Sequence, residues 1–395
     1  MTASRRSRDP PSPNSILDRQ ALIRALDERN ISLKSQHIDA FYQSLHRQHY
    51  PPLDKFVETY YLNEAKLSLD DAPTLPLKNK LSRKKNRNKL QLPKVLLDFV
   101  KDPNNGFVTI TSTVDDARTS ADGTTTKLAV KLHDGHLVES VLMRYVTKGG
   151  SRASLCVSSQ VGCAMGCTFC ATGTMGIKGN LTTGEILEQI VHADRILAQE
   201  SVSAKENNSD AKNLDLVRNV VFMGMGEPLN NYDSVVEACR GLIDRKRWNL
   251  AHGRVTVSTV GVTPKIHQLT RDLPQVCLAL SLHAPNQEMR SAIVPAAKAY
   301  KIEGLIDALD RHMMGATSKD YNANGFSKEE RIRESTRRRA MIEYVMLEGD
   351  TSTFECAHQL GKLCENRHLV VNLIPYNQTD VKDKLRCPSE AHMKE

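Results

Sequence analysis

The sequence predicts an α/β protein built on a parallel sheet or partial barrel, with a small antiparallel hairpin and a helical region before it. Two observations predict this fold class. From Gly184 onward, apolar β-branched runs alternate with amphipathic helical patterns, which is the rhythm of repeated βα units. Earlier in the chain, Asp134-Gly135 separates two segments of alternating polarity, which is the signal of a β-hairpin.

The composition is that of a globular protein and bears on its partners. Of the 395 residues, 40% are hydrophobic and 25% are charged, which is typical of globular domains. No apolar run reaches the roughly 20 residues that span a bilayer, so we expect no membrane partner. The chain carries a net charge of +8, with basic clusters at residues 78–89 and 331–339. Such clusters are either solvated loops or contacts to a polyanion such as nucleic acid.

The nine cysteines bear on the compartment. No apolar segment follows the first basic residues, so no secretory signal is predicted. A disulfide framework is therefore not expected, and three cysteines crowded into one short stretch indicate a metal site in a reducing compartment. We expect a cytoplasmic monomer, with an organelle transit peptide at Arg5, Arg6 and Arg8 as the alternative.

Residues 1–95 are predicted to form an N-terminal helical accessory region that ends in a basic linker. Apolar residues recur at helical spacing in the stretches 17–33 and 37–45. We interpret these stripes as core packing. Residues 70–88 are polar and basic and contain proline, which is typical of a loop.

Residues 96–150 are predicted to form a β-hairpin extension that leads into the core. The segments 107–111, 127–132 and 137–145 alternate in polarity, as strands with one buried face do. We therefore expect a small antiparallel sheet before the cysteine cluster.

Residues 151–380 are predicted to form the core domain, and residues 381–395 a short C-terminal segment. A helix is expected at residues 185–200. The polar segments 201–213 and 317–330 are expected to be exposed insertions. In folds of repeated βα units, the ligand site lies at the carboxyl ends of the strands. A buried parallel strand is expected at residues 217–223, and further strands are expected at residues 254–260, 276–282, 341–347 and 369–374.

The strongest chemical motif is Cys163-Ala-Met-Gly-Cys167-Thr-Phe-Cys170, of the form CxxxCxxC. Thiolates are the ligands of iron–sulfur clusters. Because a [4Fe–4S] cube has four irons, three cysteines leave one iron free. That iron can chelate the amino and carboxylate groups of S-adenosylmethionine (SAM). The alternatives are chance clustering and half of a structural zinc site, which usually shows CxxC pairs and needs a fourth ligand.

A second motif, Gly224-Met-Gly226-Glu227-Pro228, directly follows the predicted strand 217–223. Glycines at a strand end let the backbone approach a ligand closely, and the carboxylate of Glu227 can meet an ammonium group. The alternative is an ordinary turn. Because the motif lies one strand–helix unit after the cysteines, it fits a site for the cofactor amino group.

Polar residues also mark three further predicted strands. Ser258, Ser281 and His283 lie at the ends of two of them, and Asn372 and Asn377 belong to the last. A single Ser or His at a strand end is usually a cap or a structural hydrogen bond. Polar groups at consecutive strand ends predict a ligand site at that edge of the sheet.

Five sequence phrases therefore occur in a fixed order. They are Leu155-Cys156-Val-Ser-Ser-Gln-Val-Gly-Cys163, the CxxxCxxC loop, Met225-Gly-Glu-Pro228, Ser281-Leu-His-Ala-Pro-Asn286 and Asn372-Leu-Ile-Pro-Tyr-Asn377. Together they resemble the RlmN/Cfr family of radical SAM RNA methyltransferases, and the resemblance covers residues 95–380. The phrase from Cys156 to Cys170 is specific, because most other radical enzymes lack its first half.

The resemblance implies a partial (βα)6-type radical SAM barrel with a [4Fe–4S] cluster and SAM as cofactors. It implies methylation of C2 of an adenine in 23S ribosomal RNA and, in many members, of an adenine in transfer RNA, whereas the Cfr branch acts on C8. Members use one SAM to methylate a C-terminal cysteine and a second to supply a 5′-deoxyadenosyl radical. The implied partners are ribosomal RNA, transfer RNA and an electron donor such as a flavodoxin or ferredoxin.

The resemblance also implies roles for individual residues. The cluster ligands would be the three cysteines of the CxxxCxxC loop. Cys156 matches the cysteine that resolves the protein–RNA adduct, with a buried structural thiol as the alternative. Glu139 matches the proton acceptor at the adenine carbon, with a solvent-facing strand residue as the alternative. The implied contacts to SAM are Gly226, Glu227, Ser258, Ser281, Leu282, His283 and Asn377.

The resemblance ends before the family's methyl-carrying cysteine. That cysteine lies beyond the last strand, and this chain ends at Glu395 before any matching segment. Cys387 is the cysteine that remains there, and its neighbours do not fit. We therefore expect a C-terminally truncated member. Two alternative functions stay open: another radical reaction on RNA or a small molecule, and a catalytically incomplete iron–sulfur protein that binds RNA.

Overall fold

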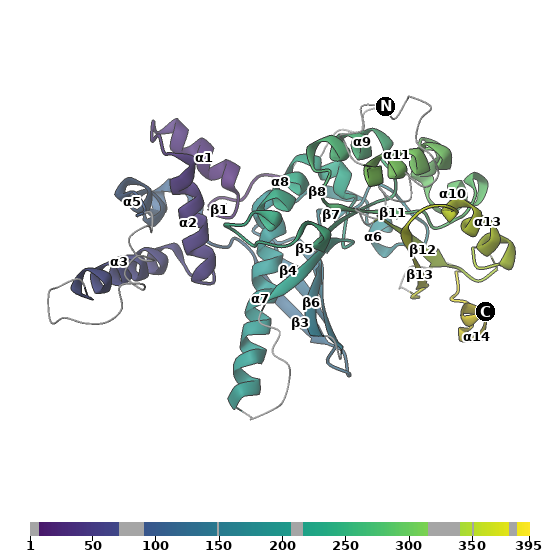
Figure 1. The fold of residues 1–395 in the computed structure, drawn as a ribbon, viewed down its shortest axis with the longest axis horizontal. Coiled ribbons are helices and arrows are strands. Elements are labelled where there is room, and N and C mark those ends of the chain that lie inside the picture. The colour runs from purple at the N-terminus through teal and green to yellow at the C-terminus, as the bar shows by residue number, and fades with distance from the viewer. Residues whose placement is uncertain are drawn as a thin grey trace.

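The computed structural model describes residues 8–70, 91–147, 150–206, 216–314, 340–349, 351–378 and 385–395. Both basic clusters, at residues 78–89 and 331–339, lie outside these ranges. The same is true of the expected insertion at 317–330. The fold is therefore described from the remaining parts of the chain (Figure 1).

A group of helices formed by the N-terminal part of the chain lies to one side of the sheet (Figure 1). They are α1 (Arg19–Glu28), α2 (Ser35–Arg47), α3 (Leu53–Asp70) and α5 (Lys94–Lys101). The side chain of Asp18 caps α1 by accepting a hydrogen bond from the Ala21 N–H at 3.0 Å. Helix α2 buries Phe41 and Leu45 on one face, as their helical spacing predicts. The predicted helical N-terminal region is confirmed.

The centre of the molecule is one nine-stranded sheet. Its strands are β3 (Thr113–Thr119), β4 (Thr125–Lys131), β5 (Leu137–Thr147), β6 (Gly150–Cys156), β9 (Val217–Phe222), β10 (Val255–Thr259), β11 (Cys277–Ser281), β12 (Ala340–Met346) and β13 (Leu369–Pro375). The order across the sheet is β13-β12-β11-β10-β9-β6-β5-β4-β3. Within this sheet, β6, β9, β10, β11, β12 and β13 are parallel. They confirm the predicted partial (βα)6 barrel.

The antiparallel half of the sheet differs from the prediction at its outer edge. The expected strand at residues 107–111 is wrong, because only β2 (Phe107–Val108) forms there and it pairs with β1 (Asn14–Ser15) in a separate sheet. The outer strand is instead β3, whose side chains are all exposed and so carry no alternation to detect. The predicted hairpin between β4 and β5 is confirmed, with Gly135 in the left-handed region at φ 83°.

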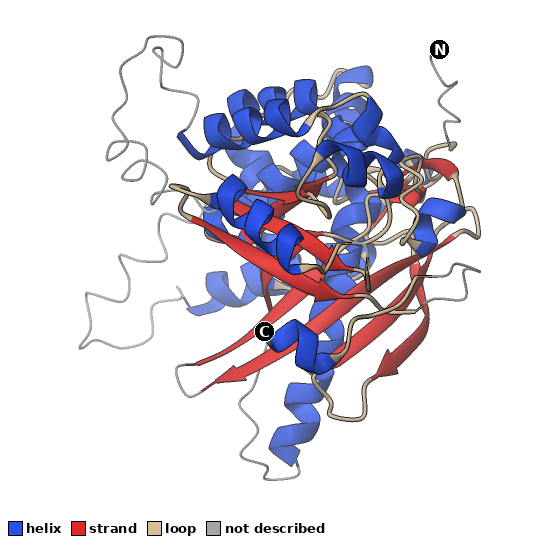
Figure 2. Ribbon diagram, turned by 90° about the vertical axis from the view of Figure 1, so that its right-hand side faces the viewer, coloured by secondary structure: helices blue, strands red, loops and turns tan. Residues whose placement is uncertain are grey.

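Most helices pack on one side of the strands (Figure 2). The longest, α7 (Thr183–Glu206), joins the two halves of the sheet. Its Gln189 Oε1 accepts hydrogen bonds from Ser140 Oγ on β5 at 2.6 Å and from the Ser158 N–H after β6 at 2.8 Å. The other α-helices are α6 (Ala171–Thr174), α8 (Tyr232–Ile243), α9 (Thr263–Asp272), α10 (Gln287–Ile293), α11 (Ile302–Met314), α13 (Phe354–Cys364) and α14 (Glu390–Lys394).

Short elements connect these layers. Strands β7 (Gln160–Gly162) and β8 (Ile177–Asn180) form a small antiparallel pair on either side of the cysteine loop. The 3₁₀ helices are η1 (Pro103–Asn105), η2 (Pro228–Asn231), η3 (His252–Arg254) and η4 (Pro295–Lys298). One continuous apolar core runs from the N-terminal helices through the sheet, and a smaller second core surrounds Cys167. Of the helices within the described ranges, none is both long and apolar enough to cross a bilayer.

Candidate functional site

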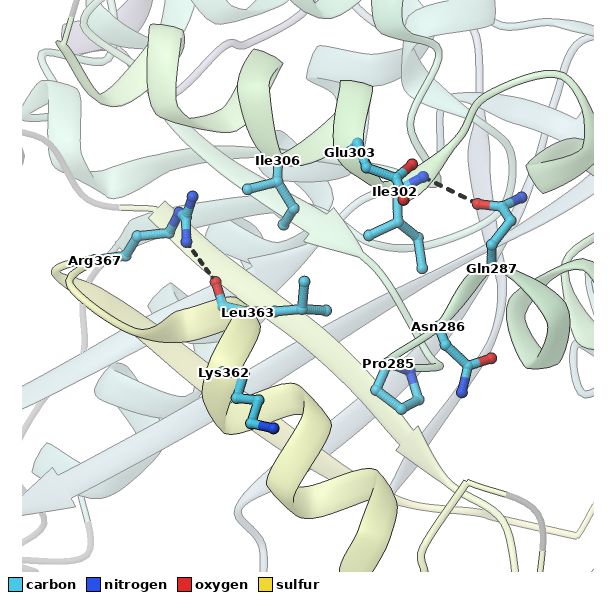
Figure 3. A pocket seen from close by; sticks show the side chains of 9 residues that line it. All are labelled: Pro285, Asn286, Gln287, Ile302, Glu303, Ile306, Lys362, Leu363 and Arg367. Carbon is cyan, nitrogen blue, oxygen red and sulfur yellow. Dashed lines mark hydrogen bonds between the residues drawn. The ribbon is translucent and has the colours of Figure 1, made fainter.

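A cavity of about 370 Å³ lies between α10, α11 and α13 (Figure 3), and it is larger than the cavity at the strand ends. In this larger cavity, the side chains of Gln287 and Arg367 already have partners. Gln287 Oε1 accepts a hydrogen bond from the Ile302 N–H at 3.0 Å, and Arg367 donates to the carbonyl oxygen of Leu363 at 2.6 Å. None of the residues that the sequence predicts as site residues lines this cavity. Its size therefore does not make it the candidate site.

The smaller cavity, about 250 Å³, lies at the carboxyl ends of the parallel strands. It brings together side chains from the cysteine loop and from the ends of three consecutive strands, which are far apart in the sequence. The sequence-predicted residues that line it are Cys163, Cys167, Cys170, Gly226, Glu227, Ser258, Ser281 and His283. This convergence, rather than volume, identifies the candidate site.

The cysteine loop runs from the end of β7 to the start of α6. Cys163 Sγ accepts a hydrogen bond from the Met165 N–H at 3.5 Å, and the Cys170 N–H donates to the carbonyl oxygen of Cys167 at 3.2 Å. Burial raises the pKa of Cys163 to about 11 and that of Cys167 to about 12. These thiols must lose their protons to bind a metal, because the thiolate is the ligand.

The donor set of the loop fits a [4Fe–4S] cluster. Its three thiols line one cavity, and Gly166 adopts φ 66°, which lets the chain turn between the first two cysteines. Among the described residues, no three His, Cys, Asp or Glu side chains converge on one metal-ion position. A cubane cluster takes one thiolate at each of several irons, so its ligands surround the cluster and not a single ion.

The loop from Gly224 to Pro228 is held by side chains from the segment before the cysteine loop. Gln160 Oε1 accepts a hydrogen bond from the Glu227 N–H at 2.8 Å. Ser158 Oγ accepts one from the Met225 N–H at 2.9 Å. The sequence phrase before Cys163 thus has a structural task, which is to shape one wall of the cavity.

Glu227 is only 2% exposed and its carboxylate is held by backbone amides. Oε1 accepts a hydrogen bond from the Leu229 N–H at 3.0 Å and Oε2 accepts one from the Val260 N–H at 2.9 Å. Burial raises the pKa of Glu227, and these amides oppose that shift. The preceding Gly226 has φ 102°, and a Cβ there would lie 2.5 Å from Cβ of Gln160, so the position requires glycine.

The next two strands contribute hydroxyls and an imidazole. Ser258 Oγ and Ser281 Oγ lie 3.1 Å apart and share a hydrogen bond. His283 Nδ1 accepts a hydrogen bond from the Val345 N–H at 3.1 Å, which leaves the ring proton on Nε2. Burial lowers the pKa of His283 to about 3, so the ring is neutral at physiological pH. Its edge meets the ring of Phe169 in the cysteine loop, with centroids 4.7 Å apart.

Sequence reasoning missed Glu343, which lines the cavity from β12. The residue is 4% exposed, and its Oε2 accepts a hydrogen bond from Asn372 Nδ2 on β13 at 2.8 Å. Its Oε1 has no hydrogen-bond partner among the described residues. Burial raises its pKa. One signal was available, since a lone carboxylate inside the apolar run from Ala340 to Met346 is unusual.

Cys156 and Glu139 lie beside the cavity and do not line it. Cys156 pairs with Val141 across β5 and β6, and Glu139 is two residues before Val141, so all three lie on one sheet face. Burial, assisted by Glu343, raises the pKa of the Cys156 thiol to about 12. The carboxylate of Glu139 is half exposed and forms an ion pair with Lys127 Nζ at 2.5 Å.

Two implied cofactor contacts and one further cysteine also lie outside the cavity lining. The side chain of Leu282 is fully buried, and its N–H donates to the carbonyl oxygen of Glu343 at 3.0 Å. Asn377 follows β13 and is exposed. Cys387 is exposed near the C-terminal end of the described chain.

Comparisons with known proteins find several related proteins. The sequence profile described as the Radical SAM superfamily matches residues 157–319. The ribosomal RNA large subunit methyltransferase N of Nitrosopumilus maritimus is 39% identical over 70% of this chain and 70% of its own length. The dual-specificity RNA methyltransferase RlmN 1 of Myxococcus xanthus is 39% identical over 66% of this chain and 62% of its own length.

A solved structure is similar over nearly the whole chain. The radical SAM methyltransferase from Sphaerobacter thermophilus superposes with a TM-score of 0.66 and is 30% identical. The match covers 97% of this chain and 90% of that one. The similarity therefore includes the helical and hairpin regions before the core.

Proposed function

The chain belongs to the RlmN family of radical SAM proteins, and on that premise we propose that it methylates C2 of an adenine in ribosomal RNA and in transfer RNA. The observation that carries the proposal is the cavity that joins the cysteine loop to Glu227, Ser258 and Ser281. The cysteine loop supplies the thiols, and the strand ends supply the carboxylate and hydroxyl groups, that a [4Fe–4S] cluster and SAM need. The matched relatives are aligned over 62% to 70% of their lengths.

In this proposal Cys163, Cys167 and Cys170 hold a [4Fe–4S] cluster, and SAM occupies the rest of the cavity. Together the two cofactors supply a 5′-deoxyadenosyl radical. Glu227 receives the amino group of SAM, because its carboxylate is held rigidly by two backbone amides at the cavity wall. The hydroxyls of Ser258 and Ser281 meet other polar groups of SAM. His283, neutral and fixed through Nδ1, presents its N–H as a donor.

The adenine is proposed to meet the protein next to the cavity, on the sheet face that carries Cys156 and Glu139. Cys156 would resolve the protein–RNA adduct, and Glu139 would accept the proton that leaves the adenine carbon. The base must be unstacked to reach them, at a cost of a few kcal/mol. Glu139 is exposed enough to meet an incoming base, and its carboxylate forms an ion pair with Lys127.

The electron that starts the reaction is proposed to come from a small redox protein such as a flavodoxin or ferredoxin. The RNA is proposed to be held in part by the basic clusters at residues 78–89 and 331–339, since Lys and Arg neutralise phosphates.

One assay tests the proposal. The chain is purified without oxygen, reconstituted with iron and sulfide, reduced, and incubated with SAM and ribosomal RNA. Mass spectrometry is expected to detect 5′-deoxyadenosine, and to detect 2-methyladenine when a cysteine that can carry the methyl group is present. An 8-methyladenine product would instead place the chain in the Cfr branch. RNA binding without any 5′-deoxyadenosine would favour an iron–sulfur protein that binds RNA and lacks catalysis.

A further inference from the structure

A buried arginine lies behind the cysteine loop and takes no part in the roles assigned so far. Arg290, on α10, has 0% exposure and is one of the largest fully buried side chains in the described chain. It does not line the cavity. A charged side chain without solvent is costly unless its charge is compensated nearby, so its position requires an explanation.

Part of the explanation is structural. Arg290 Nε donates a hydrogen bond to the carbonyl oxygen of Leu282 at 3.0 Å, and Nη2 donates to those of Ser281, at 3.3 Å, and Val260. These carbonyls lie just beyond the carboxyl ends of β10 and β11, so the guanidinium ties together two strand ends that form the cavity. Nη1 has no hydrogen-bond partner among the described residues.

The three carbonyl groups are neutral and do not balance the full charge of Arg290. The cysteine loop packs against α10, the helix that carries Arg290. The Thr168 N–H donates to the carbonyl oxygen of Ile293 at 3.0 Å, one turn after Arg290. Cys167 packs with Ile293 and Val294 in the small second core. The loop that carries the three thiols is therefore docked on the helix that carries the buried guanidinium.

The charge of Arg290 also acts on the thiol of Cys167 in the cysteine loop. Burial raises the pKa of Cys167, and the acidic groups of Cys170, Cys163 and Glu227 raise it further. Arg290 acts on it in the opposite sense. Burial lowers the pKa of Arg290 to about 10, which still leaves the guanidinium charged at physiological pH.

We propose that the charge of Arg290 raises the reduction potential of the cluster held by the cysteine loop, and so favours the electron transfer that starts the reaction. Three thiolates make the site strongly negative, and each added electron makes it more so. A buried positive charge stabilises the reduced form more than the oxidised form, because the local dielectric is low. Arg290 is thus a positioning residue that acts through the cluster. This inference rests on the proposed function.

Redox titration of the reconstituted protein, followed by electron paramagnetic resonance, tests the proposal. In R290Q the ratio of reduced to oxidised cluster at a fixed potential is expected to fall about tenfold, which for a one-electron couple is about 59 mV to more negative potential. R290K keeps the charge and is expected to stay near the wild-type value. R311Q is the control. It removes the positive charge of the partly exposed Arg311–Asp307 ion pair and should leave the reduction potential unchanged.

Each other outcome overturns the inference. A wild-type potential in R290Q, or equal shifts in R290Q and R290K, would show that the charge does not act on the cluster. Loss of bound iron in R290Q but not in R290K would mean that Arg290 holds the loop and does not tune it. A wild-type chain that binds no cluster would overturn the proposed function as well, which separates the two failures.

Discussion

The parallel and antiparallel halves of the sheet are both covered by helix α7, but they differ in the burial and in the partners of their carboxylates. In the parallel half, Glu227 is buried at a strand end and held by two backbone amides. In the antiparallel half, Glu139 is half exposed near the start of β5 and is paired with a lysine. In the proposed function, the first arrangement would fix a carboxylate for a ligand inside the cavity. The second would keep a carboxylate accessible to a large partner such as RNA.

The difference follows from topology. The ends of parallel strands meet at one edge of a sheet although the strands are separated in sequence by whole helices. In this protein a cavity lies there. Antiparallel strands joined by a tight turn leave one face open to solvent. We therefore expect radical chemistry to depend on the parallel half and contact with the base to depend on the antiparallel half.

The largest expected effect comes from breaking the parallel half at its cysteine loop. C170A removes one of three ligands to the proposed cluster, so bound iron and 5′-deoxyadenosine formation are expected to fall to background. C239A is the matched control, because Cys239 is fully buried on α8 and does not line the cavity. Iron analysis and chromatography measure both. A C170A protein with a full cluster would contradict the ligand assignment.

The next effect separates the two halves. E139Q removes a proton acceptor from the antiparallel half, so RNA methylation is expected to fall about a hundredfold, the usual range for general base catalysis. Formation of 5′-deoxyadenosine should be unchanged, because Glu139 does not line the cavity. D116N, which changes another exposed carboxylate in the same half, is the control. Equal losses of 5′-deoxyadenosine and of methylated RNA in E139Q would show that the two halves of the sheet act as one site.

A third change tests the amino ends of the parallel strands, opposite the cavity. There we expect a substitution to change the stability of the fold and not the activity. Asp194 Oδ1 accepts a hydrogen bond from the Val217 N–H at the start of β9, at 2.7 Å. Burial raises its pKa to about 7, so the unfolded chain releases this proton before the folded chain does. The stability that this residue contributes is therefore present below about pH 4 and lost as pH rises to about 7.

In D194N the side chain at position 194 has no carboxyl group and cannot release a proton. The melting temperature of D194N relative to the wild type is therefore expected to be higher by several degrees at about pH 8 than at about pH 4. SAM cleavage should not change. Thermal unfolding at a series of pH values measures the effect, and a pH-independent difference between the two proteins would show that Asp194 does not titrate in this range.

The smallest expected effect concerns the ion pair of Glu139 with Lys127. Both side chains are about half exposed, so K127A is expected to cost at most about 1 kcal/mol of unfolding free energy. A double-mutant cycle with E139Q measures the coupling between the two residues. A coupling of several kcal/mol would mean that this face is less open to solvent than the structure indicates.

Much of the fold was readable from local patterns. The strands β9, β10, β11 and β12 were predicted because buried parallel strands are apolar runs, and the turn at Gly135 was predicted because a left-handed position favours glycine. The apolar run of β13 was also predicted as a strand, although the structure leaves most of its residues exposed at the edge of the sheet. The strand β3 was missed because its side chains are all exposed. The short strand at Phe107 was misplaced, because its partner at Asn14 lies in a distant part of the chain.

By itself, the sequence determined the order of the elements and the identity of the cysteine loop, because strand periodicity and close thiol spacing are properties of short segments. Only the tertiary structure decided that Glu343 reaches the cavity, that Ser158 and Gln160 shape its wall, and that Arg290 is buried behind the cysteines. Those roles depend on which distant segments share a site and on the absence of water there. Burial and pairing of that kind arise only when the chain has folded.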